Sequence, residues 1–199
     1  MTISDRVNLV LQAEAAAIAG IPVTLAFDHA VQQMRGSRLI ITTGMGKAGH
    51  VARKCASTLC STGTPATYLH PGEAAHGDLG IIQPGTVLLA FSTSGKTREV
   101  LDLVTQGRAL GLDAVIGITG HQDSGLRLLS DCLIDLGEIT EPCPLGLTPS
   151  ASTAAMMAIG DALALALLEV KGFTREEFGA RHHGGYLGQV VRVDQEVAL

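Results

Sequence analysis

Residues 86–97 read TVLLAFSTSGKT, which is a nearly continuous apolar run followed by a turn rich in hydroxyl groups and glycine. A run of this kind indicates a strand covered on both faces, as in a parallel sheet. Similar runs and helical patterns alternate along the chain: runs at 38–43, 66–69, 114–119 and 132–136, helical patterns at 48–61, 97–110, 125–130 and 151–171. This alternation predicts an α/β fold, a three-layer αβα sandwich around a five-stranded parallel sheet. For its strand order we take the flavodoxin-like 2-1-3-4-5 of doubly wound sheets.

Helices are also predicted outside this repeat. The first 35 residues read as two helices, with Ser4 as the N-cap of the first and Gly36 at the end of the second. Residues 174–181 read as a short helix capped by Thr174. Because no linker, repeat or low-complexity tract interrupts the 199 residues, we expect one domain. Its expected parts are N-terminal helices at 1–35, a core with a C-terminal loop at 36–188, and a tail at 189–199.

The composition makes several partners improbable. Fourteen basic residues against 19 acidic ones give a net charge of −5, and no basic run is present, so nucleic acid is not an expected partner. Aromatic residues are only 3% of the chain, which argues against base-stacking platforms. The four cysteines form no C-x-x-C pair and no signal peptide precedes them, which predicts reduced thiols and a cytoplasmic protein.

One segment has about the length that spans a membrane. Residues 151–170, ASTAAMMAIGDALALALLEV, are almost entirely apolar. Asp161 lies near the middle of the segment, where a carboxylate in a bilayer would be costly. We therefore expect a helix buried in the core or between subunits, and no membrane partner.

The turn after the central strand predicts a phosphate site. A nucleotide-binding P-loop would need a glycine at Ala90, inside the strand, so that interpretation is weak. Hydroxyl groups and glycine at a helix N-terminus still form a good anion site, because backbone amides and the helix dipole favour negative charge. The alternative is an ordinary N-cap by Thr97 or Ser94. The predicted ligands are Ser92, Thr93, Ser94, Gly95, Lys96 and Thr97.

A second glycine-rich loop, GMGKAGH at 44–50, follows the first predicted strand of the sheet. In the order 2-1-3-4-5 this loop and residues 92–97 flank the switch point at the carboxyl edge of the sheet. Gly44, Gly46 and Lys47 are therefore candidate ligands of the same molecule, although Lys47 could equally be a solvated lysine at a helix start. The loop lacks the full dinucleotide fingerprint, and the two loops together predict a phosphorylated small molecule.

Titratable residues near these loops suit proton transfer beside a carbonyl group. An aldose–ketose isomerase needs a base that moves a proton between neighbouring carbons through an enediol, and a group that shuttles protons at oxygen. That route needs no redox cofactor or metal, and His70 with His76 is a weak zinc signature. The candidates are His70, Glu73, His76, Asp78, Glu99, Glu141, His182 and His183.

Several motifs in order resemble the SIS (sugar isomerase) domain of arabinose-5-phosphate isomerases. They are GMGKAGHVARK, STGTP, LHPGEAAHGDLG, STSGKTREV, CPLGLTPS with the apolar helix after it, and HHGGYLG, spanning about residues 40–188. The resemblance implies an αβα sandwich of flavodoxin-like strand order, a tetramer, and interconversion of D-ribulose 5-phosphate and D-arabinose 5-phosphate for Kdo synthesis. By motif, the active-site lysine is Lys47, the two acids are Glu99 and Glu141, and the histidines are His76 and His182.

Some positions depart from the family pattern. GMGKSGH becomes a loop with Ala48, SNSGES becomes a loop with Thr93 and Lys96, and SHPGGALG becomes RHHGGYLG. These changes leave the exact sugar open. Most members carry a pair of CBS domains after the SIS domain, and none is expected here. The alternative function is a non-catalytic phosphosugar sensor. We also expect a shared active site, with His182 delivered to a neighbouring subunit.

Overall fold

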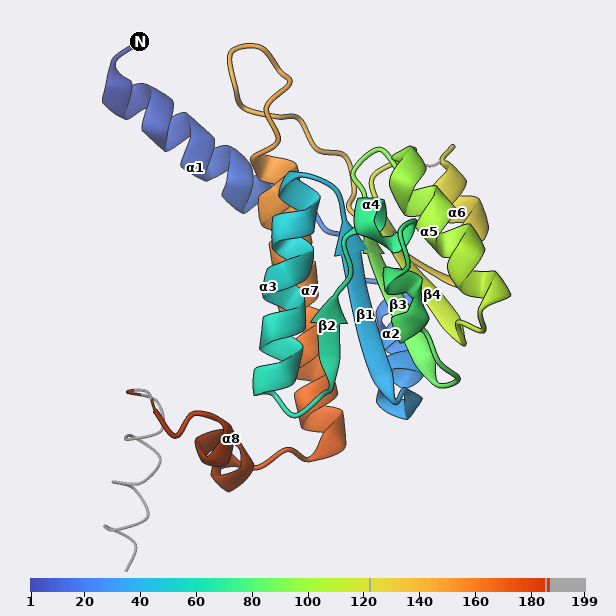
Figure 1. The fold of residues 1–199 in the computed structure, drawn as a ribbon. Helices are drawn as coiled ribbons and strands as arrows, with labels where there is room; N and C mark the ends of the chain where they lie inside the picture. The colour runs from blue at the N-terminus through green and yellow to red at the C-terminus, as the bar shows by residue number, and fades with distance from the viewer. Residues whose placement is uncertain (122, 185, 187–199) are drawn as a thin grey trace, which may run out of the picture.

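Five strands form a single parallel sheet in the order β2-β1-β3-β4-β5 (Figure 1). The computed structural model describes residues 1–121, 123–184 and 186. The α/β class predicted from the alternating pattern and the expected strand order are both confirmed. The strands are β1 (Leu39–Gly44), β2 (Ala66–Tyr68), β3 (Thr86–Phe91), β4 (Ala114–Thr119) and β5 (Cys132–Asp135).

Helices cover both faces of the sheet and make the two outer layers (Figure 1). One face carries α2 (Leu25–Gly36), α3 (Lys47–Ser61) and α7 (Ala151–Lys171). The other face carries α4 (Pro71–Ala74), the 3₁₀ turn η1 (Asp78–Ile81), α5 (Arg98–Ala109) and α6 (Gly125–Leu129). The segment 70–80, expected as a loop, therefore contains two short helical turns.

Strand β3 shows why the sheet lies in the middle of the core. All six of its residues are buried, and alternate side chains point to opposite faces. Val87, Leu89 and Phe91 join the core with α3 and α7, while Leu88 and Ala90 join the core with α5. Full burial of each large side chain is worth about 1.5–3 kcal/mol. The sequence of β3 is apolar at every position because its side chains are buried on both faces of the sheet.

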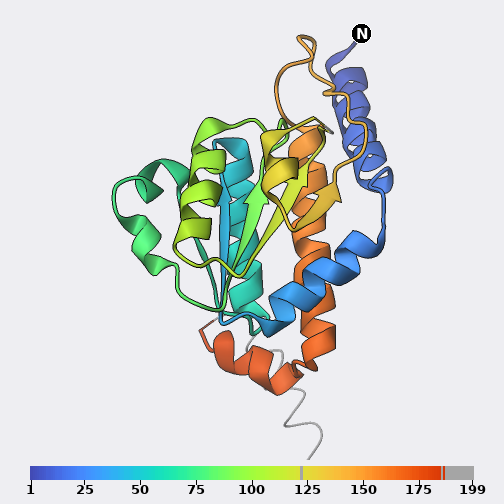
Figure 2. The same ribbon diagram turned by 90° about the vertical axis from the view of Figure 1, so that its right-hand side faces the viewer.

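The terminal helices lie at opposite ends of the molecule. α1 (Ile3–Ala19) projects beyond the carboxyl edge of the sheet, whereas α8 (Arg175–Arg181) lies near the amino edge (Figure 2). Thr2 caps α1 and forms a capping box with Asp5, so the prediction of Ser4 as the N-cap is wrong. Thr174 caps α8 as predicted. The expected tail at 189–199 lies outside the described residues.

Helix α7 is a core helix. In the described part of the chain it is the one helix that is long and apolar enough to cross a membrane, and half of its apolar stretch is buried within the chain. It packs against α1, α2 and α3, and Asp161 forms an ion pair with Lys54 of α3. Gly160 permits this close packing, because a Cβ there would meet the Sγ of Cys55 at 3.2 Å. The prediction of a buried helix is confirmed.

Candidate active site

The turn at 92–97 is built around the buried hydroxyl of Ser92. Its Oγ accepts a hydrogen bond from the Gly95 amide at 3.1 Å and lies 3.0 Å from the Oγ1 of Thr97. Gly95 has φ +60°, and a Cβ there would meet the Oγ of Ser124 at 2.3 Å. Only glycine fits this position, both for its backbone conformation and for space. The sequence S-T-S-G is therefore a tight turn held from inside.

The same turn is also tied to the end of β4. The carbonyl oxygen of Thr93 accepts hydrogen bonds from the Oγ1 of Thr119 at 3.1 Å and the amide of Gly120 at 3.2 Å, and the Nδ1 of His121 lies 2.8 Å away. The side chain of Thr97 sits at the N-cap position of α5 but makes no capping hydrogen bond. Its hydroxyl pairs with Ser92 instead, so the alternative of an ordinary side-chain N-cap by Thr97 does not hold.

A cavity of about 250 Å³ opens beside this turn, and we call it the loop cavity. The turn supplies one wall, the start of α3 supplies another, and the start of α7 supplies the third. The N-termini of three helices therefore meet around it, which favours an anion. Its lining residues are Met45, Lys47, Ala48, Phe91, Ser92, Thr93, Ser94, Thr97, Pro149 and Thr153.

Glycine positions the other loop, residues 44–50. A Cβ on Gly44 would lie 2.9 Å from the backbone of Ala48, and one on Gly49 would lie 2.6 Å from the carbonyl oxygen of Gly44. Gly46 takes φ +59° at the N-cap of α3. The hydroxyl of Tyr68 donates to the carbonyl of Gly44 at 2.9 Å, which fixes the loop to β2. The loop can thus run close to the sheet and present Lys47 at the start of α3.

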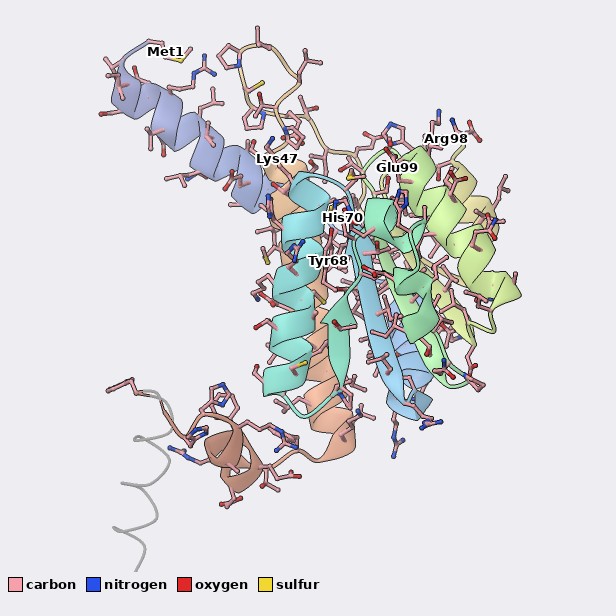
Figure 3. The ribbon with its side chains drawn as sticks, viewed as in Figure 1. Met1, Lys47, Tyr68, His70, Arg98 and Glu99 are labelled. Atoms are coloured by element: carbon pink, nitrogen blue, oxygen red, sulfur yellow. The ribbon has the colours of Figure 1, made fainter. Side chains whose placement is uncertain are left out.

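Lys47 also lines a second, larger cavity of about 510 Å³, which we call the α1 cavity because α1 forms part of its wall. The two cavities share Lys47, Pro149 and Thr153, so they are neighbours around the start of α7. Figure 3 shows Lys47 at the top of α3, at the same edge of the sheet as Glu99. The lining of the α1 cavity is Glu14, Lys47, His50, Val51, Pro149, Ser150, Thr153, Ala154 and Met157.

Glu141 lies behind this wall rather than in it. Its carboxylate accepts hydrogen bonds from the amides of Ser150, Ala151 and Ser152 at 2.8, 2.9 and 3.2 Å, so it caps α7. Burial alone would raise the pKa of Glu141, but the hydrogen bonds from residues 150–152 outweigh it and hold the pKa below its usual range. Neither the loop cavity nor the α1 cavity includes Glu141 in its described lining.

Glu99 and His76 lie on the other side of the sheet edge. Glu99 is exposed in the first turn of α5 and lines a separate cavity of about 150 Å³ between α4 and α5. His76 is exposed in the turn after α4. Lys96 is exposed as well, between Ser94 and Thr97. None of these three side chains lines the loop cavity in the described part of the chain.

His182 is far from these cavities within one chain. It follows α8, where its Nδ1 lies 2.8 Å from the carbonyl oxygen of Phe178 and its ring stacks on the Phe178 ring with centroids 3.9 Å apart. Figure 2 shows α8 at the end of the molecule opposite to α1. The four residues expected to be catalytic, Lys47, Glu99, Glu141 and His182, are thus not assembled within a single chain.

Several polar and backbone-rigid lining residues were missed by the sequence prediction, among them Glu14, His50, Pro149 and Thr153. His50, Pro149 and the start of α7 belong to motifs that carry the family resemblance, but the sequence pattern assigns no role to these positions. Glu14 has no signal of its own, because it is one polar residue in an alanine-rich helix.

Comparison with known proteins places this architecture among sugar-phosphate proteins. The SIS domain model matches residues 33–166. The arabinose 5-phosphate isomerase KdsD of Pseudomonas aeruginosa is 45% identical over 156 residues, which are 78% of this chain and 48% of that protein. KdsD of Escherichia coli strain K12 is 46% identical over 150 residues, or 75% of this chain and 45% of that protein. The chain therefore spans about half the length of the curated relatives it matches.

Two solved structures are similar over almost the whole chain. A candidate phosphosugar isomerase involved in capsule formation from Bacteroides fragilis has a TM-score of 0.88 and 44% identity, covering 93% of this chain and 100% of that one. The c3406 protein of Escherichia coli CFT073, solved in complex with arabinose 5-phosphate, has a TM-score of 0.83 and 33% identity, covering 92% and 100%.

Proposed function

This chain belongs to the SIS domain family, and we propose that it is an aldose–ketose isomerase of a phosphorylated sugar. The proposed substrates are D-arabinose 5-phosphate and D-ribulose 5-phosphate or a close analogue, interconverted through an enediol without a cofactor or metal. The observation that carries this proposal is the pair of neighbouring cavities that share Lys47, one of them bounded by the turn at 92–97. Relatives named arabinose 5-phosphate isomerases, and a similar structure holding arabinose 5-phosphate, support the choice of sugar.

In this proposal the loop cavity holds the phosphate group. Its hydroxyl groups and the backbone amides at the start of α5 and α3 are suited to an anion, and the rigid turn holds these donors in place before the ligand binds. The proposed ligands of the substrate are Gly44, Gly46, His76, Ser92, Thr93, Ser94, Gly95, Lys96 and Thr97.

The reaction itself is proton transfer at two carbons. A base removes the proton from C2 of the aldose, which gives an enediol, and then returns the proton to C1. A second group protonates the oxygen on C1 and takes the proton from the hydroxyl on C2. Lys47, at the junction of the cavities, is suited to stabilise the negative charge that develops on oxygen. We propose Glu99 or Glu141 as the carbon base and His182 as the group that acts at oxygen.

A homotetramer would complete such a site. Within one chain His182 lies at the wrong end of the molecule, so a neighbouring subunit would have to supply it. Two features support association: α1 buries none of its residues within the chain, and Leu145 and Leu147 are each 76% exposed. We further propose that the protein is cytoplasmic, which agrees with four free cysteines.

An NMR assay with a panel of phosphorylated tetroses, pentoses and hexoses, run in the presence of a chelator, tests this function. We expect D-ribulose 5-phosphate and D-arabinose 5-phosphate to interconvert, and Lys47→Ala to lower kcat about 100-fold or more. Lys54→Ala is the matched control, because Lys54 lies on the same helix but pairs with Asp161. Of Glu99→Gln and Glu141→Gln, only the variant that removes the carbon base should lower kcat by orders of magnitude. If the protein binds phosphorylated sugars but converts none of them, the alternative function of a non-catalytic phosphosugar sensor is favoured.

A further inference from the structure

The α1 cavity brings three ionisable side chains together. Glu14 comes from α1, outside the alternating strand–helix repeat, while Lys47 and His50 stand one turn apart at the start of α3. All three line the same cavity of about 510 Å³. That volume lies within the usual range of small-molecule sites, whereas the loop cavity, at about 250 Å³, is nearer to the size of a single anionic group.

These three side chains have no partners within the described chain. Glu14 and Lys47 carry opposite charges and line one cavity, yet they form no ion pair with each other, and the His50 ring makes no hydrogen bond. By contrast, Lys54 pairs with Asp161 and Arg127 pairs with Asp135 across neighbouring elements. An unpaired acid, amine and imidazole around one open cavity can each form hydrogen bonds to a polar ligand.

We propose that the α1 cavity receives the hydroxyl-bearing carbon chain of the phosphosugar, and that Glu14 and His50 select it. This inference rests on the proposed function and identifies the part of the site that recognises the hydroxyl groups of the sugar. The phosphate in the loop cavity anchors one end of the ligand. The remaining carbons then extend past Lys47, Pro149 and Thr153, which the two cavities share, into the α1 cavity.

The chemistry of the wall fits a polyol. A carboxylate accepts hydrogen bonds from two neighbouring hydroxyl groups at once, so Glu14 can recognise a pair of hydroxyls of the right relative orientation. The His50 ring can donate to or accept from a third hydroxyl. Val51, Ala154 and Met157 supply apolar surface for the C–H faces of the chain. None of these groups lines the loop cavity, so a phosphate bound there does not contact them.

Glu14 is held by packing that keeps it at this wall. It is half-buried, and α1 packs against α7, while Ala17 one turn later contacts the core. Leu11 and Ile18, about one turn before and after Glu14, are exposed, so Glu14 lies at the edge of the side of α1 that packs against the chain. Helix α1 therefore presents Glu14 toward α7 and the α1 cavity, and it contributes a specificity-determining residue from outside the sheet repeat.

Binding measurements on the full chain test this assignment without requiring turnover. Isothermal titration calorimetry with D-arabinitol 5-phosphate, a non-reacting reduced sugar, reports both cavities, and inorganic phosphate reports the loop cavity alone. We expect Glu14→Gln and His50→Ala each to weaken binding of the pentitol phosphate about 10- to 100-fold, because each removes a hydrogen bond to a desolvated hydroxyl. Phosphate affinity should stay within about twofold of the parent value.

Gln12→Ala, an exposed change on the same helix, is the control and should alter neither affinity. Unchanged pentitol phosphate binding in both the Glu14 and His50 variants would overturn the proposal. Equal loss of phosphate and pentitol phosphate binding would also overturn it, because that pattern indicates a structural role. If the chain turns over no sugar but shows the expected binding pattern, the isomerase function fails while the sugar-reading cavity stands.

Discussion

At the scale of single residues, Glu141 is held in place by its hydrogen bonds. Its carboxylate accepts hydrogen bonds from three successive amides and from the hydroxyl of Ser150, at the N-terminus of a 21-residue helix. A negative charge at that position is favoured by the helix dipole and by the donors themselves. If Glu141 is also the carbon base, the same carboxylate must leave part of this arrangement during the reaction. In that case Glu141→Gln should lower both the stability of the fold and the turnover of the enzyme.

We predict that Glu141→Gln lowers stability at neutral pH, and that the loss shrinks in acid. The hydrogen bonds lower the pKa of Glu141 in the folded state below the ordinary value of 4.5. Its contribution to stability is therefore fully present above pH 4.5 and is lost as the pH falls through the folded-state pKa. Urea unfolding at several pH values from neutral into the acid range, at one protein concentration, measures the difference between parent and variant.

The control for this measurement is Glu138→Gln, because Glu138 makes no hydrogen bond in the described chain. The free energy of unfolding of Glu138→Gln should stay close to that of the parent at every pH. A stability difference between parent and Glu141→Gln that stays constant from neutral pH into acid would contradict the capping role of the carboxylate.

At the scale of elements, the turn between β3 and α5 is rigid before any ligand arrives. Ser92 holds the turn by a hydrogen bond within it, and Thr119 at the end of β4 and Gly120 just after it donate hydrogen bonds to the carbonyl oxygen of Thr93. An anion site of this kind does not have to order its donors when the phosphate binds. The turn can be this tight only because Gly95 lacks a side chain and takes a positive φ.

Gly95→Ala should therefore weaken both the fold and the phosphate site. The Cβ would meet Ser124 and Thr119 at 2.3 and 2.8 Å, and alanine is strained at φ +60°. We expect a loss of about 1–3 kcal/mol in the free energy of unfolding, together with weaker binding of inorganic phosphate. Denaturant unfolding and calorimetry measure the two effects. Gly36→Ala is the matched control, since nothing lies within 4 Å of the new Cβ there. Parent-like phosphate affinity in Gly95→Ala would contradict the assignment of the loop.

At the scale of the whole molecule, the candidate groups lie at two ends. Lys47 and the two cavities lie at the carboxyl edge of the sheet, and His182 lies beyond the amino edge, after α8 (Figures 1 and 2). Helix α1, with Ile3 86% exposed, and the loop with Leu145 and Leu147 present apolar surface around the carboxyl edge. Such surface is typical of a contact with another copy of the chain.

Mixing two inactive variants tests whether subunits share a site. If Glu99 is the base, we predict that His182→Ala and Glu99→Gln chains, each inactive alone, regain a fraction of activity after they are mixed, unfolded and refolded together. The reason is that a shared site combines His182 from one subunit with Glu99 from another, so some sites in a mixed oligomer are intact. Isomerase turnover measures the recovery, and each variant refolded alone is the control. If oligomers that contain both variants show no activity, each site lies within one subunit.

The amino-acid sequence by itself determined the layers, because apolar runs such as residues 87–91 reflect burial on both faces of a sheet. It also brought the loops at 44–50 and 92–97 to one edge, since the carboxyl ends of neighbouring parallel strands must meet there. Only the tertiary structure decided that Glu14 joins Lys47 and His50, that Glu141 caps α7, and that His182 stands at the far end. These depend on how α1, α7 and α8 pack against the rest of the chain. Local periodicity shows that a helix has an apolar side, but the partner and the angle of approach are set by contacts between distant segments.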